Sequence, residues 1–371
     1  MAKMNILFFY VVLHLLSYSI TSVRARCASK PSPPKPACTN PSVRKEWRSL
    51  SEVERASWID AVQCLAKLPN SGKFQQVVFP SDIAAYNSSG SWYDDFVYMH
   101  MDLNHRIHIT GLFLPWHRWY IHVYEKTLRE ECGYTGVAPY WNWASDASDV
   151  YGSSIFDPNP KNGLGGWGNL SNDVEVYDGG FADFKLSYPV PHQLRRNFTL
   201  QPYIGLPSDY FPDPEIYANE TFTQSEVDYM INNFVGDYKG FQKYFESFSG
   251  AHASVHLIIG GDMSGSCPSS APRDCVGGPT FSANEPIFWL HHAMVDKVFH
   301  DWQKANSANA GIFFGGSVEM IENITIYNEY PNGGPAFLNL DSTMPANGLF
   351  EEATIGDVID TTSGILCYTY E

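Results

Sequence analysis

Apolar residues recur every three or four positions in several stretches of this sequence, the pattern of helices that bury one face. The first predicted helix begins at Ser51, because Ser51 and Glu54 have the spacing of a capping box, and Pro69–Gly72 end it. Further helices are predicted at 94–101, 115–131, 224–234, 243–260 and 285–304. The pattern therefore predicts a mainly α-helical fold with a four-helix bundle as its core.

Loops and a few peripheral strands are predicted for the rest of the chain. Residues 104–114 read as a loop, and residues 147–240 are rich in Gly, Pro, Asn and Asp. Apart from the helix at 224–234, that second region is predicted to form long surface loops, which in enzymes are usually walls or lids of a site. From Gly315 onward the sequence indicates short strands and turns.

The first 40 residues differ in character from the remainder. Residues 1–25 have the form of a secretory signal peptide, with Lys3 before an apolar stretch and a small-residue cleavage site at 23–25. An uncleaved membrane anchor is the alternative, but the apolar stretch is short for a spanning helix. Residues 26–40 form a proline-rich lead-in, and 41–371 are predicted to be the functional domain.

Sequons and cysteines agree with export, and the net charge bears on the possible partners. The net charge of −16 argues against nucleic acid or an anionic membrane as a partner. Seven cysteines fit an oxidising compartment; Cys267 and Cys275 are expected to pair, as are Cys64 and Cys132. The remaining cysteines, Cys27, Cys38 and Cys367, are left unassigned. Candidate glycosylation sites are Asn87, Asn169, Asn197, Asn219 and Asn323. A secreted glycoprotein is therefore predicted.

Most histidines lie in two parts of the chain, Tyr98–Trp119 and Ser249–Phe299. His252 and His256 are four residues apart, so on a helix they share one face and can bind one metal ion. The other candidate ligands are His100, His108 and His117, which form a second trio, and His291 or His292, either of which completes the first. Imidazole sets without a cysteine or carboxylate suit copper best.

A single histidine is more often a packed core or surface residue than a metal ligand. That interpretation is given to His122, His192, His300 and also His105, although His105 lies three residues before His108 and competes with it. A zinc hydrolase is disfavoured because no glutamate occupies an H-E-x-x-H position.

Several motifs carry a resemblance to a known family. WHRW, PYWNW, HASVH and EPIFWLHHAMVDKVF resemble the copper A and copper B motifs of the tyrosinase and catechol oxidase (polyphenol oxidase) family, in particular its short secreted fungal members. The resemblance implies two copper ions, a small phenolic substrate and O2. It also implies the ligands His100, His108 and His117 for one copper and His252, His256 and His292 for the other.

The same resemblance assigns roles near the ligands. The second histidine of the HH pair is the family's ligand, which favours His292, whereas periodicity alone leaves His291 open. Asp296, one turn later, is expected to orient a ligand histidine by accepting its second N–H. Tyr368-Thr369-Tyr370 resembles the tyrosine motif that closes the family's catalytic domain.

Departures from the family pattern narrow the predicted chemistry. Position 106 is arginine, so the cysteine–histidine thioether of many relatives is expected to be absent. Ala253 follows the first copper B histidine, where good monophenol hydroxylases often have asparagine acting with a glutamate. Glu246 is the candidate for that glutamate, and Pro279 replaces a bulky gate residue.

The predicted function is thus a dicopper oxidase that converts o-diphenols, and by extension o-aminophenols, to quinones while O2 is reduced to water. A tyrosinase with substantial monophenol hydroxylation is the first alternative. An oxygen carrier resembling the haemocyanins is the second, and single-domain length argues against it.

Overall fold

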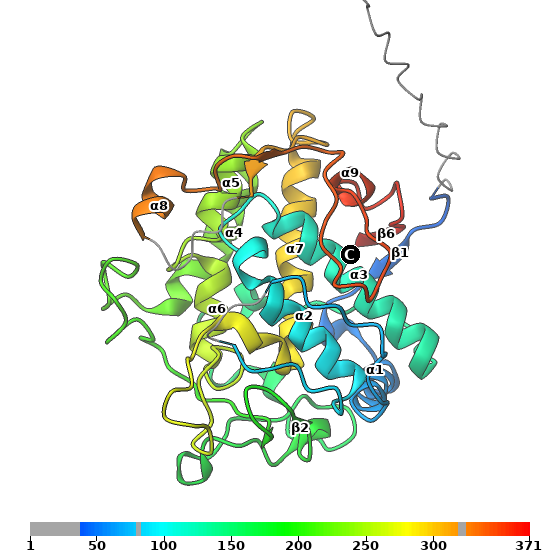
Figure 1. The fold of residues 1–371 in the computed structure, drawn as a ribbon, viewed down its shortest axis with the longest axis vertical. Coiled ribbons are helices and arrows are strands. Elements are labelled where there is room, and N and C mark those ends of the chain that lie inside the picture. Colours follow the sequence, from blue (N-terminus) through cyan, green and yellow to red (C-terminus); the bar gives the residue numbers. More distant parts are fainter. Residues whose placement is uncertain (1–37, 79–82, 318–323) are drawn as a thin grey trace, which may run out of the picture. The chain divides into compact units, whose positions relative to one another are not determined.

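Four helices form the centre of the fold, and the histidines predicted to bind metal lie on them or at their ends (Figure 1). They are α2 (Trp92–Ile107), α3 (Phe113–Cys132), α6 (Ala251–Ile259) and α7 (Ile287–Ala305). Helix α3 packs against both α2 and α7, and α6 contacts α7. This computed structural model describes residues 38–78, 83–317 and 324–371. The prediction of a mainly α-helical fold with a helical core is confirmed.

Other helices and short strands surround these four helices. The other α-helices are α1 (Glu52–Leu65), α4 (Gln224–Asn233), α5 (Tyr238–Phe245), α8 (Ile324–Glu329) and α9 (Ile355–Val358). The 3-10 helices are η1 (Trp47–Ser49), η2 (Trp143–Asp146), η3 (Ser154–Phe156), η4 (Leu170–Asn172), η5 (Gly179–Phe181), η6 (Ala218–Phe222) and η7 (Pro279–Asn284). The strands are β1 (Ser42–Arg44), β2 (Lys185–Leu186), β3 (His192–Gln193), β4 (Gly315–Gly316), β5 (Phe337–Leu338) and β6 (Tyr368–Tyr370).

Helix α1 begins as its sequence predicts. The Ser51 hydroxyl accepts a hydrogen bond from the Glu54 backbone N–H, and the Glu54 carboxylate accepts one from the Ser51 N–H. These two bonds satisfy donors that a helix N-terminus otherwise leaves unpaired. At the other end of α1, the predicted Cys64–Cys132 disulfide ties it to the last residue of α3.

Two predicted boundaries are wrong. Helix α2 continues to Ile107, so the loop predicted at 104–114 is only the short link before α3. The polar residues that obscured this helix in the sequence are buried, and Asp102, for example, accepts hydrogen bonds from the backbone of Val77 and Val78. The helix predicted at 243–260 is two helices, because α5 ends at Phe245 and α6 begins after Gly250.

Within the described part of the chain, three two-stranded ladders lie outside the bundle. Strand β1 pairs in parallel with β6, with Ser42 opposite Tyr368, while β2–β3 and β4–β5 are antiparallel. The Cys38–Cys367 disulfide, which the sequence left unassigned, reinforces the β1–β6 ladder. The predicted Cys267–Cys275 disulfide is also present. The predicted signal peptide, Cys27, Asn323 and the lead-in up to residue 37 lie outside the described residues.

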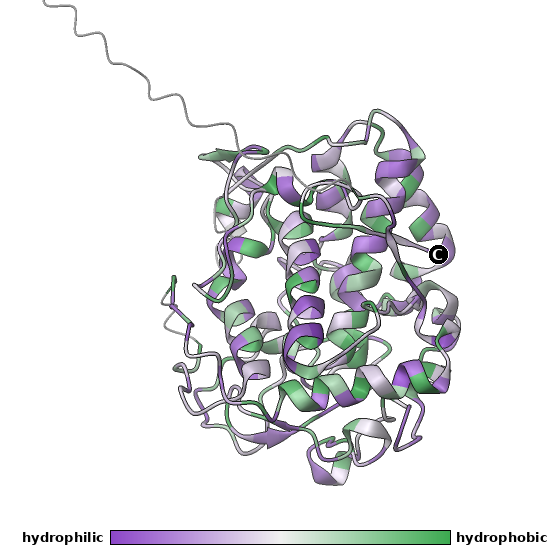
Figure 2. Cartoon of the chain, turned by 90° about the vertical axis from the view of Figure 1, so that its right-hand side faces the viewer, coloured by the Kyte–Doolittle hydropathy of each residue, from purple (hydrophilic) through white to green (hydrophobic). Residues whose placement is uncertain are grey.

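The ligand-bearing helices are buried on nearly every side. All but two of the 16 residues of α2 are buried, which explains why its sequence shows no simple apolar stripe. Figure 2 shows hydrophilic residues alternating with hydrophobic ones on the inner helices. Since buried polar side chains need partners, each buried histidine on these helices requires a hydrogen bond or a metal ion.

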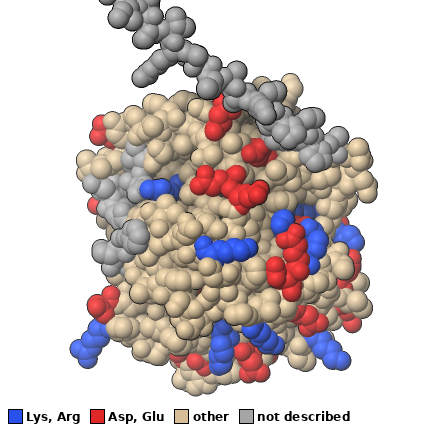
Figure 3. Space-filling model, turned by 45° about the vertical axis from the view of Figure 1, so that its right-hand side comes forward, with Lys and Arg blue, Asp and Glu red and all other residues tan. Residues whose placement is uncertain are grey.

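Charged residues are scattered over the surface. On the face shown in Figure 3, acidic and basic side chains are interspersed among a larger uncharged area. No described helix has both the length and the apolar character required to cross a bilayer.

Candidate metal centre

The first histidine cluster joins two helices and the link between them. His100 lies within α2, His108 caps the C-terminus of α2, and His117 lies in the second turn of α3. Their ring centroids are 4.9–5.7 Å apart, and all three side chains are buried. One nitrogen from each ring lies within 4.8 Å of one nitrogen from each of the other two. The structure thus brings together the trio predicted from the sequence.

The second cluster contains four histidines from two helices. His252 and His256 lie one turn apart on α6, and His291 and His292 are adjacent on α7. The ring centroids of His252 and His256 are 4.7 Å apart. The two clusters adjoin, because the His292 ring stacks on that of His117 with the centroids 4.5 Å apart.

Backbone carbonyls fix the orientation of four of these rings. The Nδ1–H groups of His100, His117, His256 and His108 donate to the carbonyl oxygens of Thr280, Phe113, Met263 and Asn104 at 2.7, 2.8, 2.9 and 3.2 Å. A carbonyl oxygen only accepts, so Nδ1 carries the proton in each neutral ring. The lone pair therefore stays on Nε2, the nitrogen left available to bind a metal.

The donor set fits a metal ion. The Nε2 atoms of His100, His117 and His252 are buried without a hydrogen-bond partner within the described structure. Leaving such a group unpaired costs about 1–3 kcal/mol each, which coordination would offset. No thiolate or carboxylate belongs to either cluster, so the ligands suit copper.

The protonation states agree with metal binding. Burial lowers the pKa of His100 to about 3 and that of His256 to about 4. The pKa values of His108, His117, His252 and His292 are also lowered, by burial first and then by the other histidines. Neutral imidazole is the form that coordinates a metal, so the rings need not lose a proton first.

One distance bears on the choice between His291 and His292. The Nε2 atoms of His256 and His292 are 3.3 Å apart. Two imidazole nitrogens bound to one ion at about 2.0–2.1 Å with a tetrahedral angle would lie about 3.3 Å apart. The contact therefore has the geometry of two ligands of one metal, although His291 belongs to the same cluster.

A pocket of about 380 Å³ opens onto both clusters, and His108, His252 and His256 form part of its wall. Ala253 and Pro279 line it, as expected for residues near the ligands. Its aromatic residues are Tyr210, Phe211 and Phe248, which sequence reasoning missed. Tyr210 and Phe211 lie in a segment without periodicity, and Phe248 lies in the break within the helix predicted at 243–260, so no sequence signal placed them at the pocket.

Glu246 lines the same pocket and is buried. Its carboxylate accepts a hydrogen bond from the Ile109 N–H at 2.7 Å and another from the Gln242 side chain. Burial raises its pKa well above the ordinary value for glutamate. The break between α5 and α6, which the sequence did not predict, places Glu246 at this wall.

The expected role of Asp296 is not what the structure shows. Its carboxylate accepts hydrogen bonds from Arg118, Arg44 and the hydroxyls of Tyr368 and Tyr370, and none from a histidine among the described residues. Backbone carbonyls rather than carboxylates hold four of the ligand rings, and Nδ1 of His292 has no hydrogen-bond partner among the described residues. Asp296 instead joins α7 to α3, β1 and the C-terminal tyrosine motif.

The histidines interpreted as structural lie outside both clusters. His192 contacts Asp262, His300 contacts Thr361, and His122 lines a groove on the outer side of α3. His105 is buried on α2. The sequence left His105 as a competitor of His108 for one ligand position, and the structure favours His108.

A helical bundle that buries two adjoining sets of imidazoles has the construction of a copper protein, and comparison with known proteins identifies which kind. The family model "Common central domain of tyrosinase" matches residues 90–305, more than half of the chain. Tyrosinase-like protein phomQ1 from Diaporthe leptostromiformis is 33% identical over 91% of this chain and 79% of its own. Tyrosinase P from Aspergillus terreus is 29% identical over 98% of this chain and 99% of its own.

A solved structure agrees with these matches. A mutant of polyphenol oxidase from Thermothelomyces thermophila superposes with a TM-score of 0.66, at 26% identity, over 91% of each chain. The chain therefore belongs to the tyrosinase family and is a type 3 copper oxidase.

Proposed function

We propose that this oxidase uses two copper ions to convert o-diphenols to o-quinones and, as a second class, o-aminophenols to o-quinone imines. Two diphenols give up four electrons and four protons, and one O2 becomes two waters. The observation that carries the proposal is the pair of buried histidine clusters that share one wall of an aromatic-lined pocket. In this proposal one copper is held by His100, His108 and His117, and the other by His252, His256 and His292.

The bound copper pair supplies the electron transfer from the phenol to O2. The protein's own residues hold the reactants for that step. In four of the six ligands, His100, His108, His117 and His256, the carbonyl bond on Nδ1 leaves Nε2 available to the metal. The aromatic rings of Phe211 and Phe248 can pack against a substrate ring, and the apolar wall keeps water away from it.

Glu246 is the residue proposed to receive a phenolic proton, directly or through one water. It lies on the pocket wall with His108 and His252, and its hydrogen bond to the Ile109 N–H fixes one oxygen. A base must lie within hydrogen-bond reach of the proton it takes, and burial raises the pKa of Glu246, which makes its carboxylate a stronger proton acceptor.

Monophenol hydroxylation is the competing activity, and Ala253 argues against it. A monophenol must lose its proton and accept an oxygen atom, which demands more of the groups around the metal than diphenol oxidation does. Ala253 lines the pocket with a methyl group and has no polar side-chain atom to orient a water beside Glu246. The relatives bear both kinds of name, tyrosinase and polyphenol oxidase, and so do not choose between the activities.

Substitution of Ala253 tests this choice. Catechols should be oxidised much faster than matched monophenols by the unaltered enzyme. Ala253→Asn should raise the monophenol rate relative to the diphenol rate by up to roughly tenfold, the value of about one hydrogen bond. Ala253→Val is the matched control, since it changes the bulk of the side chain without adding a polar atom. Equal rates on both substrates without a lag in the unaltered enzyme would contradict the proposal.

We also propose that the chain is secreted and glycosylated, with residues 1–25 as the signal peptide. Three disulfides support an oxidising compartment. Asn87, Asn169 and Asn197 are exposed. Asn219 is only half-exposed and its Nδ2 donates to the Ala147 carbonyl at 2.6 Å, so a glycan there would disturb that bond. Mass spectrometry of secreted protein before and after glycosidase treatment tests these sites.

A further inference from the structure

One loop supplies a carbonyl to each histidine cluster. Met263 accepts the Nδ1–H of His256 at 2.9 Å, and Thr280 accepts that of His100 at 2.7 Å. These two carbonyls lie at the two ends of segment 263–280, which we call the carbonyl loop. The orientation of one ring in each cluster thus depends on where this loop sits.

The two ends of the carbonyl loop are tied together. The Gly278 N–H donates to the Gly265 carbonyl at 2.9 Å, and the Cys267–Cys275 disulfide closes the loop just beyond. Gly265 has a positive φ of 72°, and a Cβ there would lie 1.5 Å from the Gly278 oxygen, so only glycine allows this close approach. Because the ends are tied, a displacement of the loop would move both carbonyls.

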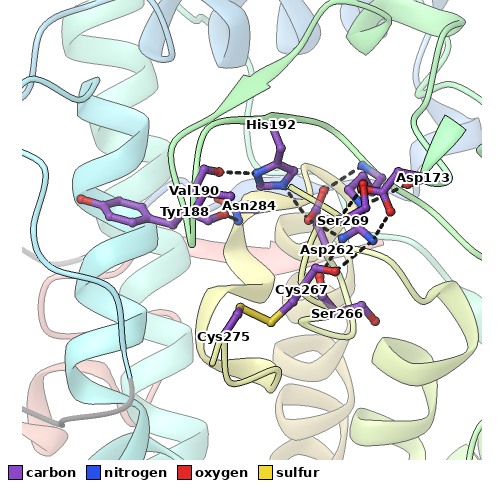
Figure 4. Close-up of a disulfide and its surroundings, with 11 residues drawn as sticks. Asp173, Tyr188, Val190, His192, Asp262, Ser266, Cys267, Ser269, Cys275 and Asn284 are labelled. Atoms are coloured by element: carbon purple, nitrogen blue, oxygen red, sulfur yellow. Dashed lines mark hydrogen bonds and ion pairs between the residues drawn. A yellow bond between two sulfur atoms is a disulfide. The ribbon is translucent and has the colours of Figure 1, made fainter. Parts of the chain in front are cut away.

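Asp262 fixes the start of the loop to the rest of the protein. Its side chain is fully buried and both of its oxygens are used. Oδ2 accepts the Arg195 N–H at 2.7 Å, and the Asp262 N–H donates to the Arg195 carbonyl at 3.1 Å. Oδ1 accepts a hydrogen bond from Nε2 of His192 at 2.8 Å (Figure 4).

His192 faces an acceptor on each side of its ring. Nδ1 donates to the Val190 carbonyl at 2.7 Å, and Nε2 donates to the Asp262 carboxylate. Since neither a carbonyl nor a carboxylate oxygen can donate, both ring nitrogens carry protons and the ring is an imidazolium. The side chains of His192 and Asp262 are 4% and 0% exposed, so the two charges form a buried pair.

Arg195 holds the outer part of the loop. Its guanidinium donates to the carbonyls of Ser266 at 2.6 Å and Cys267 at 3.3 Å. It also pairs with Asp173 at 3.1 Å, and the second Asp173 oxygen accepts the Ser269 N–H at 2.8 Å. Figure 4 shows Asp173, Asp262 and His192 grouped with the loop residues Ser266 and Ser269.

We propose that Asp262 is a positioning residue for both copper sites. Together with His192 and Arg195 it anchors the carbonyl loop, so that the carbonyls of Met263 and Thr280 hold the rings of His256 and His100. Ser264, Gly277 and Pro279 of the same loop line the substrate pocket, so the anchor also sets one wall of that pocket. The proposal rests on the ligand assignment in the proposed function.

The test is the copper affinity of Asp262→Asn, measured by competition with a chelator. Outer partners of metal ligands typically contribute 10–100-fold to affinity, so we expect a loss of about that size at both sites. Arg195→Lys keeps the charge but loses the forked contacts with Ser266 and Cys267, and we expect a smaller loss at both sites. If Asp262→Asn does not fold, the copper affinity of Arg195→Lys decides whether the proposal holds.

Asp95→Asn is the matched control. Asp95 is buried and accepts hydrogen bonds from the Ser71 N–H at 2.8 Å and the Tyr86 hydroxyl at 2.7 Å, away from the carbonyl loop. Its substitution should lower stability but leave copper affinity unchanged. If Asp262→Asn and Arg195→Lys bind copper within twofold of the unaltered chain, the positioning role is wrong.

Hydrogen exchange of the copper-free protein gives a second readout. Exchange over 263–280 should rise in Asp262→Asn and not in Asp95→Asn. If the unaltered chain binds no copper, the proposed function fails, while the exchange result still tests the anchor. Unchanged exchange over 263–280 in Asp262→Asn would overturn the anchor itself.

Discussion

Replacement of Asp296 by asparagine should be one of the most destabilising single changes in this chain. The carboxylate is buried and bonds to Arg118, Arg44, Tyr368 and Tyr370. Asparagine removes the charge and replaces one acceptor oxygen by a donor NH2. Arg44 keeps an ion pair with Glu125 at 3.1 Å, whereas Arg118 is left with Gln303 and two backbone carbonyls.

The size of the effect follows from the burial of these groups. Removing one partner of a buried ion pair usually costs about 3–5 kcal/mol of unfolding free energy. For a chain of this size roughly 0.7 kcal/mol corresponds to one kelvin, so the unfolding midpoint should fall by about 4–7 °C. The copper-free protein should be used, because bound metal adds its own stabilisation.

The pH dependence has a definite sign. Burial opposes ionisation, but Arg118 and Arg44 outweigh it and hold the pKa of Asp296 below its ordinary value. The carboxylate therefore contributes stability above the ordinary carboxyl pKa, and that contribution is lost as pH falls through the lowered pKa. The difference between the unaltered protein and Asp296→Asn should be largest near neutral pH and shrink in acid.

Asp301→Asn on the same helix is the control. Asp301 pairs with Lys297 at 2.6 Å, but both side chains are partly exposed. Such a pair contributes about 0.5 kcal/mol or less, so the midpoint should hardly move. Should Asp296→Asn cost under about 1 kcal/mol in denaturant unfolding, the reasoning about this buried ion-pair network is refuted.

Two further predictions concern charge. Burial lowers the pKa of His192, but the hydrogen bond and charge of Asp262 outweigh burial, so the pKa is raised. The stabilising His192–Asp262 pair is therefore complete below about pH 6.5, the ordinary histidine pKa, and is lost as pH rises through the raised pKa. His192→Gln should therefore cost about 1 kcal/mol more at about pH 5.5 than at about pH 9 in urea unfolding; equal costs at both would refute the pairing. No lysine or arginine lines the described pocket, so the carboxylate of dihydrocaffeate would have no cation to pair with there. Dihydrocaffeate should therefore have a KM roughly tenfold above that of its uncharged methyl ester. Equal KM values would contradict the apolar wall.

Local patterns in the sequence were sufficient for much of the fold. The capping box at Ser51, the four-residue spacing of His252 and His256 and the cluster at 291–292 all depend on neighbours within one or two helical turns. Such local signals do not depend on contacts with distant parts of the chain. The histidine clusters could therefore be predicted residue by residue, whereas periodicity left the choice between His291 and His292 open.

Features that depend on distant contacts could not be predicted. The Cys38–Cys367 disulfide joins residues 329 positions apart, and the partners of Asp296 come from both ends of the chain. The carbonyls of Met263 and Thr280 carry no side-chain signal at all, because any residue supplies a carbonyl. The break before Gly250 was hidden within a helical pattern, and it decides where Glu246 lies.

The copper content of the purified chain, measured by elemental analysis, tests the central claim most directly. The account predicts about two copper ions per chain in protein that oxidises catechols. It also predicts about one ion and essentially no oxidase activity in His256→Ala, with His122→Ala as the unaffected control because His122 lies outside both clusters. One metal ion per chain, or stoichiometric zinc in a fully active sample, would contradict it.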